Sequence, residues 1–383
     1  MALRAVQLLE RVPISVQATI ARALFGLPKP VRRLLIGAPV RLDGQELASD
    51  AQLLLWLDKL TDASMVQSRD HVIARTALDA KSEIVRKRDV EPVDVRTVEV
   101  AGAEGPLQAR LYTPAKAPDD GPLLVFYHGG GWVIGSLGTH DNLCRFIAAN
   151  GELRVLSVDY RLAPEAPFPA AADDALAAFR WAVKHAADLG ANPDAIAVGG
   201  DSAGGNLAAV TSYLASKRRG AQPAFQLLFY PGVDASVRRP SRELFAEGFF
   251  LTSREMDWFL GHYAPDEASR TDPKLSPLLA SNLAGLPPAY ITTAGFDPLR
   301  DEGEAYARKL GEAGVPVVLR RHADLIHGFA NFIGLGTRFT EAVSEAIGAL
   351  RTGLAMGSMG SPGSSATTKP AQPRKRSTPA KKQ

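Results

Sequence analysis

Ser202 stands in a sequence setting that suits a nucleophile, the pentapeptide Gly-Asp-Ser-Ala-Gly. The apolar run 195–199 before it is typical of a buried strand, and the alanine-rich run 206–214 after it is typical of a helix. A serine at a tight strand-to-helix turn has an exposed hydroxyl and a strained backbone, and Gly200 and Gly204 let the strand and the helix pass closely. The alternative is a glycine-rich structural turn, so the assignment depends on finding partners for the serine elsewhere in the chain.

A second glycine-rich segment, His-Gly-Gly-Gly-Trp at residues 128–132, directly follows the apolar run 123–127. Consecutive glycines let backbone N–H groups approach a ligand closely, and an oxyanion hole needs two or three such donors converging on one point. Ala203, which follows the serine, supplies another donor at the start of a helix. A flexible glycine turn is the competing interpretation, but a strand precedes the segment and Trp132 ends it.

A serine nucleophile also needs a base, and the chain has seven histidines. For a serine at this kind of turn, the partners follow it along the chain in the order acid, then histidine. His327 lies in Ile-His-Gly-Phe, in the loop expected after a last strand at 315–319. His322 is nearer the end of that strand and is the second candidate.

The acid that would orient the histidine is predicted to be Asp297. It lies in Gly-Phe-Asp-Pro-Leu, just after the apolar run 289–293, and functional groups gather at the carboxyl ends of parallel strands. The proline that follows holds Asp297 extended and outside the next helix. Asp301 and Glu302 are nearby alternatives, but we expect them in the first turn of that helix, where the helix dipole favours carboxylates.

The elements that must position these side chains form an α/β pattern. Predicted strands lie at 95–100, 107–112, 123–127, 155–158, 196–198, 225–230, 289–293 and 315–319. Predicted helices lie at 49–60, 77–88, 171–187, 206–216 and 302–313. Strands that alternate with helices predict a mostly parallel eight-stranded sheet with helices on both faces, and the first two strands read as an antiparallel hairpin.

Three segments lie outside this alternation. Residues 1–42 carry seven Lys or Arg and one acid, and Val16, Ile20, Ala23 and Leu24 share one helical face that ends at Gly26. Such a helix can pack on the body, cover an apolar pocket or lie on a membrane surface. Residues 234–276 are aromatic-rich and predict a helical excursion. Residues 355–383 are Gly, Ser, Pro, Thr, Ala and basic residues, and we expect them to be disordered.

Composition narrows the class of protein. The chain has 383 residues, 46% of them hydrophobic and 22% charged, and one cysteine, Cys144, so it can form no intrachain disulfide. Six basic residues after Thr352 have no acidic counterpart, which leaves −3 on the remaining chain although the formal total is +3. We therefore expect no nucleic-acid partner. The sequence shows no clustered ligand set for a metal, no membrane span and no secretory signal, so we expect a cytoplasmic protein without a cofactor.

Five motifs follow one another in order: His-Gly-Gly-Gly-Trp (128–132), Asp-Tyr-Arg-Leu-Ala-Pro-Glu (159–165), Gly-Asp-Ser-Ala-Gly-Gly (200–205), Asp-Pro-Leu-Arg-Asp-Glu (297–302) and His-Gly-Phe (327–329). In this order they resemble the hormone-sensitive-lipase-like branch of the α/β-hydrolases, over about residues 95–350. The resemblance implies Ser202, Asp297 and His327 as the catalytic triad, and the amides of Gly130, Gly131 and Ala203 as the oxyanion hole. The supporting motif residues are His128, Gly129, Trp132, Gly200 and Gly204.

The resemblance also implies a domain plan and an activity. Residues 1–94 would form an N-terminal helical cap segment, residues 95–354 the catalytic domain, with 234–276 as a further part of the cap, and residues 355–383 the basic tail. The expected function is a serine carboxylesterase acting on small esters with short to medium acyl chains. The alternatives are a lipase at lipid surfaces, an amidase or deacetylase, and a non-catalytic binding protein on the same fold. Weak membrane-surface contact through the basic segments and a homodimer are left open.

Overall fold

The structure is a computed structural model of the chain and describes residues 12–60, 66, 68–87, 90–217 and 219–360. Within these ranges one sheet has eight strands, and a separate two-stranded hairpin consists of β1 (Arg41–Leu42) and β2 (Gln45–Glu46). The strands of the large sheet are β3 (Val93–Ala101), β4 (Pro106–Pro114), β5 (Gly121–Tyr127), β6 (Arg154–Val158), β7 (Ala191–Asp201), β8 (Gln226–Phe229), β9 (Ala289–Phe296) and β10 (Val317–Ile326). The predicted eight-stranded α/β sheet is confirmed.

The sheet is antiparallel only toward one edge. Its strand order is β10-β9-β8-β7-β5-β6-β4-β3. The β3–β4 and β4–β6 pairs are antiparallel, and every other neighbouring pair is parallel. The carboxyl ends of β5, β7, β9 and β10 therefore meet at one end of the sheet, which we call the catalytic edge, and each is followed there by a predicted site residue.

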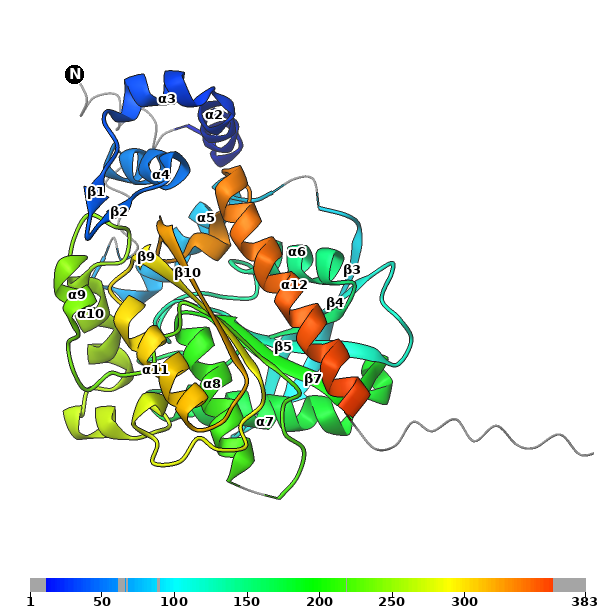
Figure 1. Cartoon of the computed structure of the whole chain (residues 1–383). Coiled ribbons are helices and arrows are strands. Elements are labelled where there is room, and N and C mark those ends of the chain that lie inside the picture. Colours follow the sequence, from blue (N-terminus) through cyan, green and yellow to red (C-terminus); the bar gives the residue numbers. More distant parts are fainter. Residues whose placement is uncertain (1–11, 61–65, 67, 88–89, 218, 361–383) are drawn as a thin grey trace, which may run out of the picture.

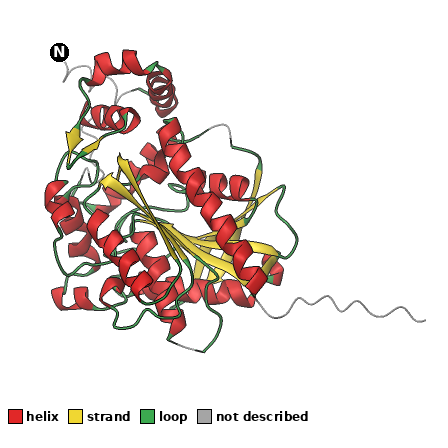
Figure 2. Cartoon of the chain, in the orientation of Figure 1, coloured by secondary structure: helices red, strands yellow, loops and turns green. Residues whose placement is uncertain are grey.

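Helices cover both faces of the sheet (Figures 1 and 2). One face carries α7 (Ala170–Lys184), α8 (Ala203–Ser216) and α11 (Arg300–Glu312), and the other carries α6 (Asp141–Gly151) and α12 (Thr337–Gly360). Strand β5 shows why both faces are needed. Leu123, Val125 and Tyr127 belong to the core on the first face, whereas Leu124 and Phe126 belong to the core on the second. Alternate residues of a strand point to opposite faces, so its apolar run is buried on both sides.

In the described residues before the sheet there are four helices, which we call the N-terminal helices: α2 (Ile14–Gly26), α3 (Lys29–Ile36), α4 (Ser49–Leu60) and α5 (His71–Ile84). Figure 1 shows α3 and α4 beyond the carboxyl ends of β9 and β10. Helix α2 ends at Gly26, as expected. The helix predicted at 77–88 instead begins at His71, because the Asp70 carboxylate accepts hydrogen bonds from the amides of Val72 and Ile73.

The apolar face predicted for α2 is only partly correct. Val16 and Ile20 remain 44% and 41% exposed, while the buried residues of the helix are Ala18 and Ala21. The sequence pattern also did not predict α3, whose two prolines, Pro28 and Pro30, flank its first residue. Proline is compatible with the first turn of a helix because its missing N–H has no partner there.

The segment 234–276 is helical, as expected. It contains α9 (Pro240–Leu244), α10 (Ser253–Tyr263) and the short 3₁₀ helix η2 (Glu267–Thr271). Helix α10 begins with a capping box in which Thr252 and Glu255 each bond the backbone amide of the other. Further 3₁₀ turns lie at Ala187–Leu189 (η1), Pro277–Leu279 (η3) and Phe329–Phe332 (η4).

The last two elements extend beyond the predicted boundaries. Strand β10 was expected to end near residue 319 but runs to Ile326, because it is an edge strand whose exposed Arg320 and neighbours break the apolar pattern without breaking the strand. Helix α12 continues to Gly360, past residue 355, where the tail was expected to begin. Residues 361–383 lie outside the described residues. No helix in the described ranges is both long and apolar enough to cross a bilayer.

Candidate active site

Ser202 occupies a sharp turn between β7 and α8. Its backbone has φ 55° and ψ −116°, a conformation that costs a non-glycine residue about 1–3 kcal/mol. A Cβ atom on Gly200 would lie 2.4 Å from the carbonyl oxygen of Tyr127, and one on Gly204 would lie 1.9 Å from the same atom. Both positions therefore need glycine, and the close passage of strand and helix holds the serine in its strained conformation.

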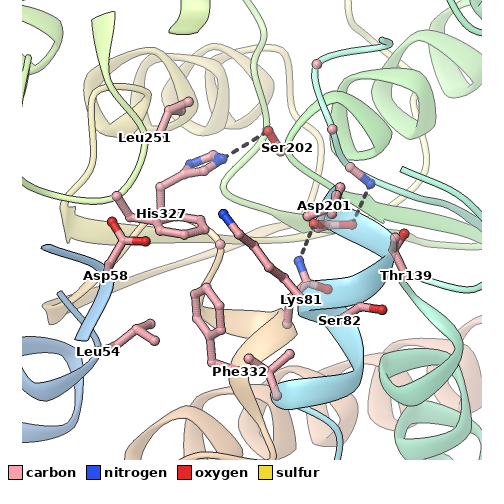
Figure 3. A pocket seen from close by; sticks show the side chains of 18 of the residues that line it. Leu54, Asp58, Lys81, Ser82, Thr139, Asp201, Ser202, Leu251, His327 and Phe332 are labelled. Carbon is pink, nitrogen blue, oxygen red and sulfur yellow. Dashed lines mark hydrogen bonds between the residues drawn. The ribbon is translucent and has the colours of Figure 1, made fainter. Parts of the chain in front are cut away.

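The three predicted catalytic side chains form one continuous chain of hydrogen bonds. His327 Nε2 lies 3.0 Å from Ser202 Oγ (Figure 3). On the other side of the ring, His327 Nδ1 lies 2.8 Å from Asp297 Oδ2. Asp297 is fully buried, and its other oxygen accepts a 2.8 Å hydrogen bond from the amide of Leu299. The carboxylate is thus fixed at both oxygens, which makes Nδ1 the donor toward Asp297 and leaves Nε2 as the acceptor for the serine proton.

Strand register explains how residues 30 positions apart meet. Phe296 and Ile326 pair across β9 and β10, and Asp297 and His327 are the next residue of each strand. The β10 register shifts between His322 and Ile326, where the longer segment of β10 faces a shorter segment of β9. This irregularity extends the edge strand and delivers His327 beside the acid.

His322, the second candidate for the base, lies elsewhere. It is within β10, upstream of the register shift, and its Nδ1 is 3.1 Å from Nη2 of Arg338 on α12. Burial, with the nearby Arg338 charge, lowers the pKa of His322 to about 4. Because Arg338 of α12 holds the His322 ring, His322 does not contact Ser202.

The predicted oxyanion-hole residues line the cavity into which Ser202 opens. Gly130 and Gly131 have φ values of 117° and 59°, and Cβ atoms there would lie 2.2 Å from Ile134 O and from the Phe259 ring, respectively. Neither glycine amide donates a hydrogen bond to any described residue, and Ala203 is the first residue of α8, where amides have no intrahelical partner. All three residues line the same cavity as Ser202. Their N–H groups are thus available to an oxygen bound beside the serine.

The glycine loop is the run of three glycines at residues 129–131. Its neighbours His128 and Trp132 pack against other aromatic rings and make no hydrogen bond to Ser202. His128 is fully buried, stacks on Tyr160 with ring centroids 4.4 Å apart and has Nδ1 2.8 Å from the carbonyl of Gly129. Burial lowers its pKa to about 3, so the ring is neutral at physiological pH. Trp132, with φ 61°, stacks on Tyr263 of α10 and faces the cavity.

Asp201 is a residue whose importance the sequence pattern did not reveal. Its Oδ1 accepts from the amide of Gly129 at 2.9 Å and lies 3.1 Å from His140 Nε2, and its Oδ2 accepts from Asn331 at 2.9 Å (Figure 3). Burial would raise its pKa, but His140 and the hydrogen bonds together lower the pKa overall. One carboxylate thus ties the glycine loop and the turn at Ser202 to the segment after His327. Its place inside the Gly-Asp-Ser-Ala-Gly motif was the available signal.

A cavity of about 710 Å³ opens over Ser202 and His327. Part of its wall comes from the N-terminal helices, and Figure 3 shows Leu54, Asp58 and Lys81 around the same space as the serine and the histidine. Another part comes from segment 234–276, through Leu251, Met256, Phe259 and Leu260. Both segments expected to border the serine therefore do so. In the described part of the chain, no three His, Cys, Asp or Glu residues are grouped to hold a metal ion.

Proteins with similar sequences and structures place the chain in a family. A family profile described as alpha/beta hydrolase fold matches residues 124–331. The carboxylic ester hydrolase LipN of Mycobacterium tuberculosis is 45% identical over 87% of this chain and 90% of its own length. An ethyl acetate hydrolase of Pseudomonas putida is 40% identical over 70% of this chain and 85% of its own length. The ester hydrolase EH1AB1 from the Lake Arreo metagenome superposes with a TM-score of 0.77 at 41% identity, covering 81% of this chain and 99% of that one.

The range matched by the family profile includes the glycine loop, the serine turn and the acid and histidine loops. The expected resemblance is thereby confirmed: the chain belongs to the hormone-sensitive-lipase-like family of the alpha/beta hydrolase fold.

Proposed function

We propose that this chain hydrolyses carboxylic esters with Ser202 as nucleophile, His327 as general base and acid, and Asp297 as the group that orients the histidine. The enzyme class follows from relatives 40–45% identical over most of the chain that are carboxylic ester hydrolases. The observation that carries the residue assignment is the continuous hydrogen-bond chain from Ser202 through His327 to buried Asp297, which opens on the cavity.

The geometry supports a two-step route. His327 Nε2 takes the proton of Ser202 while Oγ attacks the ester carbonyl, and the resulting oxyanion accepts hydrogen bonds from the amides of Gly130, Gly131 and Ala203. His327 then donates the proton to the leaving alcohol, which gives an acyl-serine. A water molecule, deprotonated by the same histidine, hydrolyses this ester and restores the serine.

The preferred substrates in this proposal are esters with short to medium acyl chains. The cavity is bounded on one part by the N-terminal helices and on another by segment 234–276, so its length is finite. Each methylene that a chain buries there contributes about 0.8 kcal/mol until the wall is reached, after which a longer chain clashes. We therefore expect rates to peak at about four to eight acyl carbons, given cavities of this size.

Residues 1–94 and 234–276 act together as a cap in this proposal. Ile14, Ile20 and Leu24 of α2 line the cavity, as do Met256 and Phe259 of α10. The cap excludes water from the oxyanion, and in a dry site each hydrogen bond to the developing charge is stronger.

Weak contact with a lipid surface fits the outer side of the N-terminal helices. Val31, Leu34 and Leu35 of α3 are 41%, 86% and 41% exposed, and Lys29 of the same helix is also exposed. A short helix with exposed apolar and basic residues suits the headgroup region of a membrane. In this proposal the protein is cytoplasmic and associates peripherally. A homodimer is also proposed, with the exposed Val318 and Leu319 of edge strand β10 as supporting features.

Activity against p-nitrophenyl esters of two to sixteen acyl carbons tests the proposed substrate class. A maximum at four to eight carbons supports a carboxylesterase with a closed acyl site. A maximum at twelve or more carbons that rises when the ester forms an emulsion favours a lipase instead, and hydrolysis of matched anilides at comparable rates favours an amidase. Absence of any turnover by folded protein favours the binding-protein alternative.

A further inference from the structure

One carboxyl group in the cavity takes no part in the proposed reaction. Glu302, in the first turn of α11, lines the cavity although it is only 5% exposed. Its Oε1 accepts hydrogen bonds from the amides of Val233 and Asp234, at 2.7 and 3.2 Å. Its Oε2 has no hydrogen-bond partner among the described residues. The carboxyl therefore uses one oxygen to hold a backbone segment and leaves the other available to a ligand.

The segment that Glu302 holds is next to the nucleophile. The amide of Gly232 lies 3.4 Å from the carbonyl oxygen of Ser202, and Asn206 donates a 2.7 Å hydrogen bond to the carbonyl of Gly232. Gly232 also lines the cavity, and Val233 belongs to the core on the α8 and α11 face. Glu302 thus holds a segment of the cavity wall whose first residue, Gly232, contacts the backbone of Ser202.

The residues that line the cavity belong to the cores on both faces of the sheet. Phe332 and Leu335, which line it with His327, belong to the core on the α6 and α12 face. Leu275 and Leu299, which line it with Glu302, belong to the opposite core. Because His327 protonates the leaving alcohol, the proposal assigns the alcohol to the first wall and the acyl group to the wall of Glu302.

Burial, and not an unmatched neighbouring charge, raises the pKa of the Glu302 carboxyl. Asp234 pairs with Arg239 at 2.7 Å, and Arg242 pairs with Asp257 at 2.6 Å, so the neighbouring charged groups are already matched. Burial raises the pKa of Glu302 to about 8, with Asp234 adding to the rise and Arg239 and the two backbone hydrogen bonds opposing it. Since Oε1 accepts two N–H bonds, the proton resides on Oε2, which is then a hydrogen-bond donor.

We propose that Glu302 is a specificity-determining residue of this esterase, and that its Oε2 hydroxyl donates a hydrogen bond to an ether or carbonyl oxygen in the acyl chain of the substrate. The inference rests on the ester-hydrolase function proposed above. It predicts that acyl chains with an internal oxygen are preferred over isosteric hydrocarbon chains at neutral pH. Above about pH 8 the carboxylate can no longer donate, so this preference disappears.

Two pairs of p-nitrophenyl esters test the proposal: butyrate against methoxyacetate, and pentanoate against 3-methoxypropionate. Within each pair one methylene is replaced by oxygen, so the ratio of kcat/KM values cancels titration of the triad at any one pH. The ratios are measured at pH 6.5 and 9 for the wild type, Glu302→Met, Glu302→Gln and Glu304→Gln, after subtraction of spontaneous hydrolysis.

At pH 6.5 we expect Glu302→Met to lower the oxygen-to-methylene ratio about three- to tenfold for at least one pair, the range for loss of one neutral hydrogen bond. Glu302→Gln keeps a donor at every pH, so its ratio should match the wild type at pH 6.5 and should not fall at pH 9. The wild-type ratio should fall at pH 9 to that of Glu302→Met. Glu304, a buried glutamate of the same helix that pairs with Arg321, does not line the cavity, so Glu304→Gln should behave as the wild type.

A purely structural role for Glu302 would lower the rates on both esters of a pair equally and leave the ratios unchanged. Ratios that do not respond to Glu302→Met in either pair, or that respond equally to Glu304→Gln, overturn the proposal while leaving the esterase function intact. Failure of the wild type to hydrolyse any of the four esters would instead contradict the function on which the proposal rests. Thermal unfolding of each variant identifies any that fails to fold.

Discussion

The catalytic edge of the sheet and the N-terminal helices border the same cavity but are built differently. At the catalytic edge, Gly200 and Gly204 admit no further atom, and Asp297 and Asp201 are buried with their oxygens hydrogen bonded. In α2 and α3, six large apolar side chains are 39–86% exposed, namely Ile14, Val16, Ile20, Val31, Leu34 and Leu35. The first region is fixed by close backbone contacts, whereas α2 and α3 leave large apolar side chains exposed, although the buried Arg32–Asp50 ion pair joins α3 to α4.

Because the two regions are built differently, substitutions and deletions in them should have different consequences. A catalytic group must be held within a fraction of an ångström of its productive position, so damage at the catalytic edge should abolish turnover. The N-terminal helices shape the cavity and exclude water, so damage there should alter rate and chain-length preference without removing the chemistry. The predictions below test that separation, from the largest expected effect to the smallest.

The largest loss of activity is expected when the general base, His327, is replaced. His327→Ala removes the proton acceptor 3.0 Å from Ser202 Oγ and should lower kcat by about 10³-fold or more. His322→Ala, a matched control in the same strand and loop region, should cost far less, because His322 contacts Arg338 and not the serine. Steady-state kinetics on p-nitrophenyl butyrate measure both. A larger loss in His322→Ala would mean that the last loop is misassigned.

Deletion of residues 1–42 should have an intermediate effect. It removes the α2 side chains that line the cavity, so activity on soluble esters should fall and the chain-length profile should flatten, while some turnover remains. If the deleted protein is folded and keeps both its rate and its profile, the segment is no cap. Co-sedimentation with anionic liposomes at low and high salt then tests whether the segment instead binds membranes.

A smaller effect is expected on stability as the pH falls. His128 and His322 are buried, and burial lowers their pKa values to about 3 and 4, below the ordinary value of 6.5. Between pH 6.5 and 4 these histidines therefore bind protons in the unfolded chain but not in the folded chain, and they decrease the free energy of unfolding as the pH falls through this range. Glu302, whose pKa is raised to about 8, opposes this decrease, so the expected net slope is smaller than two histidines alone would give. Above pH 6.5 these two groups cause no such change.

Thermal unfolding midpoints between pH 4.5 and 7.5 measure this dependence. His322→Gln should reduce the slope, whereas the 1–42 deletion should keep it, because neither histidine lies in the deleted segment. A slope that is lost with residues 1–42 would place the titrating groups in the N-terminal helices and contradict the assignment.

The smallest effect is expected from the C-terminal end. Truncation after Gly360 keeps α12 whole, including buried Leu354, and should leave kcat/KM for a soluble ester unchanged within error. A large loss would show that residues 361–383 reach the cavity or hold an assembly together.

The sequence predicted the catalytic edge better than the N-terminal helices, for a physical reason. Strained turns and close backbone contacts accept few residue types, so Gly200, Gly204 and the glycine loop could be recognised from the amino-acid sequence alone. Strands buried on both faces are continuously apolar, which located β5 to β9. The extension of edge strand β10 was missed because its exposed residues are polar.

The N-terminal helices were harder to predict because their burial depends on which body they pack against. The pattern of α2 suggested one apolar face, but only Ile20 and Leu24 of that face line the cavity, together with Ile14 and Ala21. The role of Asp201 depends on His140 and Asn331, which are distant in sequence and meet it only in the folded chain.

The most direct test of the central claim is covalent labelling of Ser202. A fluorescent organophosphonate should label the wild type at Ser202, identified by peptide mass spectrometry, with loss of esterase activity in proportion to labelling. Ser202→Ala, which leaves the turn and its glycines in place, should unfold at a similar temperature, take up no label and hydrolyse no ester above background. Labelling of the alanine variant at another serine, with ester hydrolysis retained, would contradict the account.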